Sequence, residues 1–385
     1  MISSESGIGG QGLRRPVRIG IETSVLRMNR AGSGLYTRNL VAHLQSLCSD
    51  QRLFLYAFGT DGTSTYRKRL ETVIRDTLWM HLVLPLKIRR DRIDVFHATT
   101  LSAPLTIPCR TVLTVLDLIV VSHPEWFDHR WFYFYTRAML PILARRAHSV
   151  VTISQCSKRD LMDHYGLPAE KITVVPPGVD HRVFHPNYDR EAIGRMRDRL
   201  GIHGKYILSV GTLEPRKNLP RLVESFAMLR AYAEDYRLVI VGDRGWQYEQ
   251  IFRKVQTLGL EDRVRFLGYV PDSELPLLYR GAELLVYPSL YEGFGVPIVE
   301  AMASGCPVVC SNRSSMPDVV GEAGILVDPE DAKAMAEAMG RVLADPSLAD
   351  ALRTRGLDRA QSFRWEDSAK TLLDVYENVL GRAAR

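Results

Sequence analysis

Two glutamates eight positions apart are the residues of this sequence best placed to do chemistry. Glu292 and Glu300 enclose the stretch YEGFGVPIVE (291–300), whose glycines allow a sharp turn and close approach to a ligand. If the whole stretch were helical, a rise of ~1.5 Å per residue would separate the two carboxylates by about 12 Å. A hydrolase acid–base pair needs ~5–9.5 Å. We therefore expect the two carboxylates to contact different parts of one long ligand.

The residues between the glutamates add hydrogen-bond donors. The backbone N–H groups of Gly293, Phe294 and Gly295 precede an expected helix, and a helix N-terminus favours anions. Carboxylates such as Glu292 and Glu300 accept hydrogen bonds from sugar or ribose hydroxyls. The ordinary alternative is one glutamate at the start of a helix and a second, exposed glutamate further along it.

A pair of cations stands at a second transition from strand to helix. Arg216 and Lys217 lie in GTLEPRKN (211–218), between the apolar run KYILSV and the helical stretch LPRLVESFAML. Arginine offers a bidentate fork and lysine a point charge, and together they suit a diphosphate. The alternative is a pair of solvated loop cations.

A glycine pair follows the first apolar run. Gly32 and Gly34 flank Ser33, and we expect a helix to start near Leu35 with Ser33 as its cap. The free backbone N–H groups would cradle a phosphate, although a simple tight turn explains a lone GxG equally well. The full GxGxxG of a dinucleotide-binding dehydrogenase is not present here.

Short apolar runs alternate with helix-length segments along the whole chain. This alternation predicts an α/β protein with two doubly wound parallel sheets facing a central cleft, where ligands bind beyond the carboxyl ends of the strands. We expect a disordered tail (1–16), a first domain (17–185), a second domain (186–365) and a C-terminal helix (366–385) that packs back towards the first domain. The polar stretch HPNYDREAIG (185–194) is expected to be the linker. The predicted strands are 17–22, 52–58, 94–99, 111–117, 149–154, 172–178, 205–211, 236–242, 263–268, 282–289, 306–311 and 324–328.

Composition favours an ordinary globular protein. Hydrophobic residues make up 46% and charged residues 24% of the 385 residues, and no apolar run reaches the ~18 residues of a membrane span. The N-terminus lacks the apolar core of a secretory signal. The five cysteines form no CxxC pair, which favours reduced thiols over a metal site. We expect a cytoplasmic protein.

The charge is uneven. Residues 1–185 carry 24 Lys and Arg against 15 Asp and Glu, whereas residues 186–385 carry 26 against 29. This asymmetry indicates that the first half faces an anionic partner; a solvated basic surface is the alternative. No nucleic-acid-binding motif is present, so a phosphorylated acceptor or an anionic membrane surface is favoured. The basic, aromatic stretch 129–148 would touch such a membrane, or else is a partly buried helix.

Together these motifs resemble a known family. The stretches SVGTLEPRKN, FLGYVPDSEL, YPSLYEGFGVPIVEAMASGCPVV and GEAGILVDPED, with GSGLYTRNL and VVTISQCSKRDL in the first half, resemble the retaining glycosyltransferases of family four. The resemblance covers the chain after the tail and implies the GT-B fold. It also implies a nucleotide-sugar donor.

The resemblance implies a role for each matching residue. Arg216 and Lys217 would neutralise the donor diphosphate, Glu300 would hold the ribose hydroxyls, and Glu292 would hold the donor sugar. The remaining donor contacts implied are Gly32, Gly34, Val270, Gly293, Phe294, Gly295 and Val296. Such enzymes need no bound metal, and the chain has no DxD-type motif near a strand end.

One position departs from the family. Where the family often has His-Asp, this chain has Leu116-Asp117, so a histidine contact to the donor sugar is missing. Asp117 is then the candidate to contact sugar or acceptor. His97 and His123 are acceptor-side candidates, and a structural role is the alternative for each.

The expected reaction is transfer of a hexose, with retention, from a nucleotide diphosphate sugar to a glycan or lipid-linked acceptor. The motifs are most similar to those of bacterial mannosyl- and deoxymannosyltransferases of surface polysaccharide synthesis. GDP-mannose or a GDP-deoxyhexose is therefore the expected donor, with UDP-glucose, UDP-N-acetylglucosamine and dTDP-rhamnose as alternatives. There are two rival hypotheses. The first is a non-catalytic GT-B protein that binds nucleotide or glycan, and Leu116 in place of the family's histidine is the reason to consider it. The second is a nucleotide-sugar epimerase.

Overall fold

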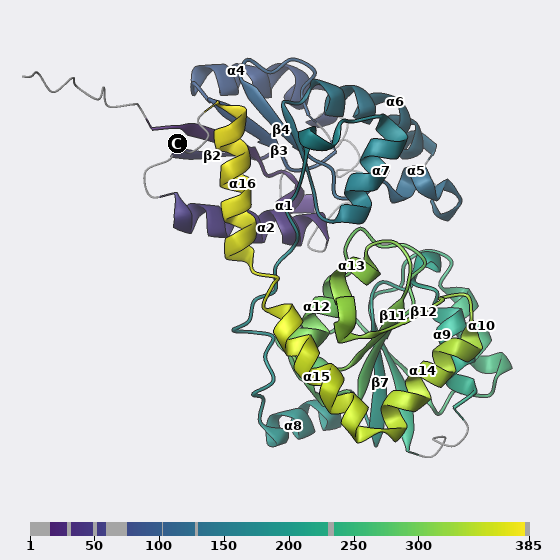
Figure 1. Cartoon of the computed structure of the whole chain (residues 1–385). Helices are drawn as coiled ribbons and strands as arrows, with labels where there is room; N and C mark the ends of the chain where they lie inside the picture. The colour runs from purple at the N-terminus through teal and green to yellow at the C-terminus, as the bar shows by residue number, and fades with distance from the viewer. Residues whose placement is uncertain are drawn as a thin grey trace, which may run out of the picture.

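The computed structural model describes residues 16–28, 32–48, 52–58, 75–101, 103–127, 130–229 and 235–381. Apart from its last residue, the predicted tail (1–16) lies outside these residues. The chain builds two six-stranded sheets, and every neighbouring pair of strands is parallel. The predicted α/β class with two doubly wound sheets is confirmed (Figure 1).

All twelve predicted strands are present. The first sheet has the order β2-β1-β3-β4-β5-β6 and the second β12-β11-β10-β7-β8-β9. Both are covered by helices on their two faces, so the strands read as continuous apolar runs. The strand bounds are β1 Arg18–Glu22, β2 Arg52–Tyr56, β3 Val95–Ala98, β4 Arg110–Thr114, β5 Ser149–Thr152, β6 Ile172–Val174, β7 Lys205–Val210, β8 Tyr236–Val241, β9 Val264–Gly268, β10 Leu284–Tyr287, β11 Val308–Ser311 and β12 Ile325–Val327.

Helices connect the strands within each half. In the first half they are α1 Val25–Met28, α2 Ser33–Leu47, the π-helix η1 Arg75–Val83 with α4 Leu84–Arg90, α5 Ile119–Ser122, η2 Pro124–Trp126, α6 Arg130–Arg146, α7 Gln155–Tyr165 and η3 Ala169–Lys171. In the second they are α8 Arg190–Leu200, η4 Pro215–Lys217, α9 Leu219–Ala227, α10 Glu249–Thr257, α11 Leu275–Gly281, α12 Val296–Ala303, α13 Met316–Val320, η6 Gly321–Ala323, α14 Ala332–Ala344 and α15 Pro346–Ala360. The last helix is α16, Trp365–Val379. Within the described residues, no helix is long and apolar enough to cross a membrane.

The predicted linker (185–194) is wrong in its second part. Helix α8 begins at Arg190, inside that stretch, because the Asp189 side chain caps it by accepting a hydrogen bond from the Glu191 N–H (3.1 Å). The stretch is polar because residues 185–189 form a connection and residues 190–194 form the first turn of helix α8. The irregular segment between β6 and α8 covers 175–189.

The chain crosses between the halves twice, and the two crossings touch. After α15 the chain returns to the first half, where α16 packs against α2 (Figure 1). A Cβ atom at Gly178, in the first crossing, would lie 2.3 Å from the Trp365 backbone nitrogen in the second. Val179 N–H donates to the Phe363 carbonyl (3.0 Å). Glycine at 178 is thus required by the close approach of the two backbones.

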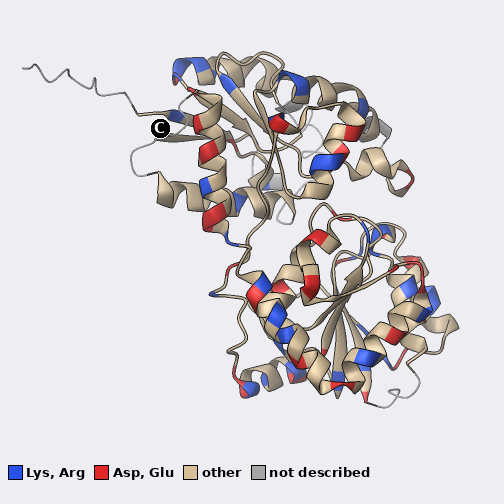
Figure 2. Ribbon diagram, viewed as in Figure 1, with Lys and Arg blue, Asp and Glu red and all other residues tan. Residues whose placement is uncertain are grey.

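Charged residues are spread over both halves, and Lys and Arg segments lie along α4 at the top of the first half (Figure 2). All five cysteines are free. Among the described residues, no group of three or more His, Cys, Asp or Glu side chains is arranged to hold a metal ion.

Candidate functional site

A cavity of about 910 Å³ lies between the two halves at the carboxyl ends of their strands. This is where open parallel sheets place ligands. The second half contributes the charged wall, which includes Glu214, Arg216, Lys217 and Glu292. Much of the first half's wall is apolar and includes Val25, Leu35, Leu101, Leu116, Ile119 and Ile153.

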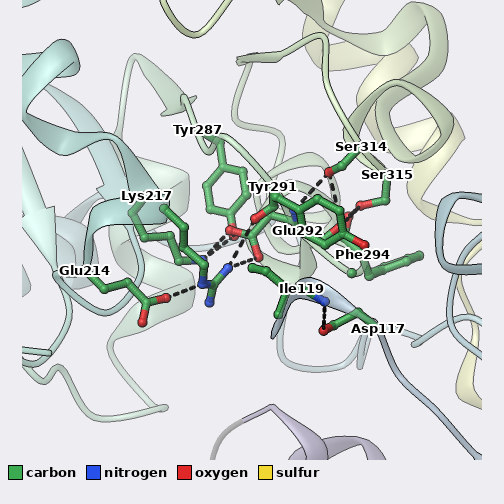
Figure 3. Close-up of polar contacts among 12 residues, drawn as sticks. Asp117, Ile119, Glu214, Lys217, Tyr287, Tyr291, Glu292, Phe294, Ser314 and Ser315 are labelled. Atoms are coloured by element: carbon green, nitrogen blue, oxygen red, sulfur yellow. Dashed lines mark hydrogen bonds and ion pairs between the residues drawn. The ribbon is translucent and has the colours of Figure 1, made fainter. Parts of the chain in front are cut away.

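Glu292 is the centre of the charged wall (Figure 3). Lys217 Nζ lies 2.5 Å from its Oε1, and Arg216 Nη1 lies 2.5 Å from its Oε2. The Tyr287 hydroxyl accepts a hydrogen bond from Lys217 (2.8 Å) and donates one to Glu292 Oε1 (2.9 Å). Glu214 pairs with the other side of the Arg216 guanidinium. Two cations and two carboxylates therefore share one buried cluster.

Burial and the neighbouring charges shift the pKa values of the four charged residues in this cluster. Burial alone would raise the pKa of Glu292, but Arg216 and Lys217 outweigh it and lower that pKa to about 2. Burial lowers the pKa of Lys217 and raises the pKa of Glu214. For Arg216, burial acts to lower the pKa, but Glu292 and Glu214 raise it overall. Glu292 is thus an anion at neutral pH, held ionised by its two cationic neighbours.

Local backbone structure brings the two predicted motifs together. The cations lie on the short 3-10 helix η4, which ends at Asn218 in the left-handed conformation (φ 55°). The Leu290 N–H donates to the Arg216 carbonyl (2.8 Å). The Asn218 side chain donates to the Pro329 carbonyl (2.6 Å). The turn that carries Arg216 and Lys217 is thereby fixed to the glycine loop, the segment around Glu292 to Gly295.

Two serines fix the glycine loop. Glu292 N–H donates to Ser314 Oγ (2.9 Å), and Ser315 Oγ lies within hydrogen-bond distance of the carbonyls of Glu292 (2.9 Å) and Phe294 (2.7 Å). Gly295 has φ 107°, which disfavours any residue with a side chain, and it precedes α12. Figure 3 shows this ring of contacts beside Glu292.

Asp117 approaches the same loop from the first half. A Cβ atom at Gly293 would lie 2.7 Å from Asp117 Oδ2, so the glycine permits this approach. Asp117 Oδ1 accepts from the Ile119 N–H (3.2 Å). Burial raises the pKa of Asp117, with Glu292 and Asp160 adding to the rise and Arg216 and the Ile119 N–H opposing it. Leu116 and Asp117 both line the cavity.

Helix α7 of the first half also contacts this loop. The Tyr291 hydroxyl donates to Asp160, and Ser157 Oγ donates to the Gly293 carbonyl (3.4 Å). The His123 ring lies edge-on to the Tyr291 ring (5.6 Å between centroids) and stacks on Trp126 (4.0 Å). The acceptor-side candidate His123 thus lies beside the loop but does not line the cavity.

Several other predicted site residues do not line the cavity. Glu300 is buried in α12 and accepts a hydrogen bond from the Tyr279 hydroxyl (2.8 Å), so it is not the exposed helical glutamate of the alternative reading. Burial raises its pKa to about 7. Val270 is buried. The donor-contact and acceptor roles of these residues stay predictions.

The glycine pair is only partly placed as predicted. Gly32, with φ 50°, precedes α2 and lines the cavity together with Ser33, Phe294, Gly295 and Val296. Gly34 is buried inside the helix. Ser33 is the first helical residue rather than the cap, because the helix starts two residues earlier than expected.

His97 has a structural position. Its Nδ1 lies 2.7 Å from the Tyr376 hydroxyl and its Nε2 lies 2.7 Å from Thr114 Oγ1, so both ring nitrogens are engaged. Burial lowers its pKa to about 3. The side chain is enclosed between β3, β4 and α16, which favours the structural alternative for His97 over the acceptor-side role.

Among the cavity residues that sequence reasoning missed are Glu214, Tyr287, Phe127 and Trp246. Tyr287 ends β10, and Glu214 stands two positions before Arg216 within the quoted motif. Phe127 and Trp246 face each other across the two halves with ring centroids 5.6 Å apart. Among the described residues, the buried indole N–H of Trp246 has no hydrogen-bond partner. The position of Tyr287 at a strand end was a signal that the sequence carried.

Comparison with known proteins identifies the family to which the chain belongs. The model of the family "Glycosyl transferases group 1" matches residues 195–359, and that of "Glycosyltransferase Family 4" matches residues 30–183. The chain belongs to these glycosyltransferases. The predicted resemblance to this family is confirmed.

Mannosyltransferases are among the relatives of this glycosyltransferase. The O-antigen chain mannosyltransferase B of Escherichia coli is 32% identical over 284 residues, which cover 74% of each chain. The serotype-specific mannosyltransferase WbdA of the same species is 28% identical over 287 residues, covering 73% of this chain. This chain spans about a third (35%) of the length of WbdA.

Solved structures share the fold of this glycosyltransferase. A sucrose-phosphate synthase from Thermosynechococcus elongatus matches with a TM-score of 0.77 and 22% identity over 96% of this chain and 100% of that one. The Anabaena protein Alr3699/HepE, solved with UDP-glucose, matches with a TM-score of 0.74 and 21% identity over 94% and 99%. The GT-B architecture is therefore confirmed.

Proposed function

We propose that this glycosyltransferase moves a hexose, with retention, from a nucleotide diphosphate sugar to a glycan or lipid-linked acceptor. The observation that carries the proposal is the pair Arg216 and Lys217, held against Glu292 on the wall of a cavity between two parallel sheets. Buried cations aimed at one place stabilise charge as it develops on a leaving group. A diphosphate is such a leaving group.

In this scheme the bond between sugar C1 and the diphosphate oxygen breaks while the acceptor hydroxyl oxygen bonds to C1 on the same face. The hydroxyl proton passes to the departing phosphate. Arg216 and Lys217 take up the charge of the diphosphate. Glu292 and the amides of the glycine loop hold the sugar, and Asp117 faces it from the first half. No enzymic nucleophile and no metal ion are required.

The proposed donor is GDP-mannose. This donor is supported by the similarity of the chain to mannosyltransferases and by the sequences of its motifs. The structural relative solved with UDP-glucose supports a nucleotide-sugar donor in general. We place the reaction in the cytoplasm, in the assembly of a surface polysaccharide.

The test is a calorimetric panel of GDP-, UDP- and dTDP-sugars on the purified protein, followed by product analysis. We expect GDP-mannose to bind with micromolar affinity, and an added acceptor to receive the sugar. A different tightest donor would overturn the nucleotide assignment. Conversion of the donor alone to another sugar isomer would indicate an epimerase, and tight binding without turnover by any acceptor extract would indicate a non-catalytic protein.

A further inference from the structure

The helix formed by η1 and α4 presents an unusual outer surface. Its inner face, with Trp79, Met80, Leu84 and Ile88, is buried against the first sheet. Its outer face carries Leu78, Leu82 and Leu86, which are 55%, 59% and 68% exposed. Their spacing of four places them on one side of the helix. A row of three exposed leucines is more than the scattered apolar residues of an ordinary surface.

Cations follow the leucine row. Lys87, Arg89 and Arg90 are exposed at the end of α4, and residues 78–90 include no acidic residue. Arg90 pairs with Asp91 (3.0 Å). Within the described part of the chain, no acidic side chain lies within ion-pair distance of Lys87 or Arg89. Part of the basic excess of the first half thus lies on α4, where Lys and Arg positions gather (Figure 2).

The first half exposes further apolar residues. Helix α6 belongs to the same buried cluster as η1 and α4, and it exposes Phe134 and Ile142. Leu105 is exposed beside η1, where its N–H donates to His81 Nδ1 (3.4 Å). The segment that leads to Leu105 begins with Thr99, Thr100 and Leu101, which line the cavity. The exposed Leu105 and the cavity residue Leu101 are thus four positions apart in the chain.

We propose that this surface, formed by the leucine row of η1–α4 with Lys87 and Arg89, docks the enzyme on a bilayer containing anionic lipids. A helix with leucines on its outer face and Lys and Arg beside them suits the boundary between headgroups and acyl chains. The cores of protein–protein interfaces are depleted in charged residues, and Lys in particular is depleted from such interfaces. The inference rests on the proposed function and deepens its lipid-linked acceptor, because docking would hold the enzyme at the bilayer in which such an acceptor lies.

The test is flotation of the purified chain, without substrates, with vesicles of phosphatidylcholine alone or mixed with phosphatidylglycerol. We expect binding to the mixed vesicles that weakens as salt is added. The double variant Lys87→Ser/Arg89→Ser should lower the vesicle partition coefficient at least about tenfold, since each cation near an anionic surface contributes about fivefold. Leu82→Ser/Leu86→Ser should lower it at least as much.

The matched control is Leu258→Ser/Arg355→Ser, which removes an exposed leucine and an exposed cation from the second half. It should bind vesicles as the unchanged chain does, and thermal melting should show that all three variants fold. Failure of the unchanged chain to bind mixed vesicles, as expected if a protein covers this face, would overturn the proposal. Equal binding by all variants would also overturn it. Vesicle binding by a chain that transfers no sugar would reject only the proposed function.

Discussion

Tyr291, the neighbour of Glu292, donates its hydroxyl hydrogen to Asp160 of the opposite half. This bond joins the loop that carries Glu292 to helix α7, and Ser157 adds a second bond one turn earlier. Separation of the two halves would have to break both. The position of the loop that carries Glu292 is thus coupled to the position of the first half.

Removal of this bond should slow transfer while leaving nucleotide binding intact. In Tyr291→Phe we expect kcat to fall roughly tenfold, because a hydrogen bond to a charged group contributes about 1.5–3 kcal/mol. The dissociation constant for the nucleoside diphosphate should change less than about twofold, since Arg216 and Lys217 are untouched. Arg159→Ala is the control. It removes an ion pair to Asp318 that also bridges the halves (3.5 Å) but is exposed, and such pairs contribute little. Equal effects of the two variants on kcat would refute the coupling.

The cationic pair should dominate catalysis. Arg216→Ala and Lys217→Ala should each lower kcat/KM at least about 10²-fold, the loss typical of removing one preorganised donor from a developing anion. Steady-state assays with the identified donor measure this. Arg221→Ala, which breaks a half-buried pair with Glu224 on α9, should stay within about twofold. Turnover near that of the unchanged chain in either test variant would defeat the site assignment.

The charge balance of the cluster predicts opposite effects on binding and turnover. Two cations face two carboxylates, so the cluster is close to neutral before a diphosphate enters. Glu292→Gln leaves one positive charge in excess. We expect it to bind nucleoside diphosphate about threefold to tenfold more tightly by calorimetry, yet to transfer sugar more slowly because a sugar contact is altered. Glu214→Gln makes the same charge change and should tighten binding with a smaller loss of kcat. Weaker binding by both variants would contradict this account.

Glu300 predicts a specific pH dependence of stability. Burial raises its pKa to about 7 from the ordinary value of 4.5. Between these values the folded state holds a proton that the unfolded state has lost, so this residue's contribution to stability falls as pH rises. Glu300→Gln keeps an acceptor for Tyr279 and removes the titration. Its free energy of unfolding relative to the unchanged chain should improve between pH 5 and 8 by on the order of 2–3 kcal/mol. A difference that stays constant with pH would show that Glu300 does not titrate in this range.

Metal removal should leave transfer intact. We expect the rate after EDTA treatment and desalting to match the untreated rate, since Arg216 and Lys217 supply the positive charge that a metal would otherwise provide. Added Mg²⁺ or Mn²⁺ should change it less than about twofold. An absolute requirement for a divalent cation would contradict this part of the mechanism.

The sequence predicted the framework because its signals are local. Each strand of the second half is a run such as YRLVIV (236–241) that ends at, or is followed by, glycine, proline, asparagine or aspartate, and burial on both faces makes such runs continuously apolar. Arg216, Lys217 and Glu292 were found because each belongs to a short motif at the end of a strand. Their convergence on one cavity follows from the common direction of parallel strands.

The remaining features depend on pairs that sequence spacing does not encode. His97 and Tyr376 lie 279 positions apart, and Asp160 and Tyr291 lie 131 apart. Only the docking of α16 and of α7 brings these side chains together. The direction in which Glu300 points depends on how α12 is rotated against α11, which carries Tyr279.

The return of α16 to the first half has a consequence for synthesis on the ribosome. Trp365, Leu372 and Tyr376 fill part of the first half's core, so that core lacks them until α16 leaves the exit tunnel. The second half has its six strands and helices α8 to α15 before that point. We therefore expect the second half of the chain to complete its folding before the first half does. This is the reverse of the usual order, in which N-terminal domains fold first.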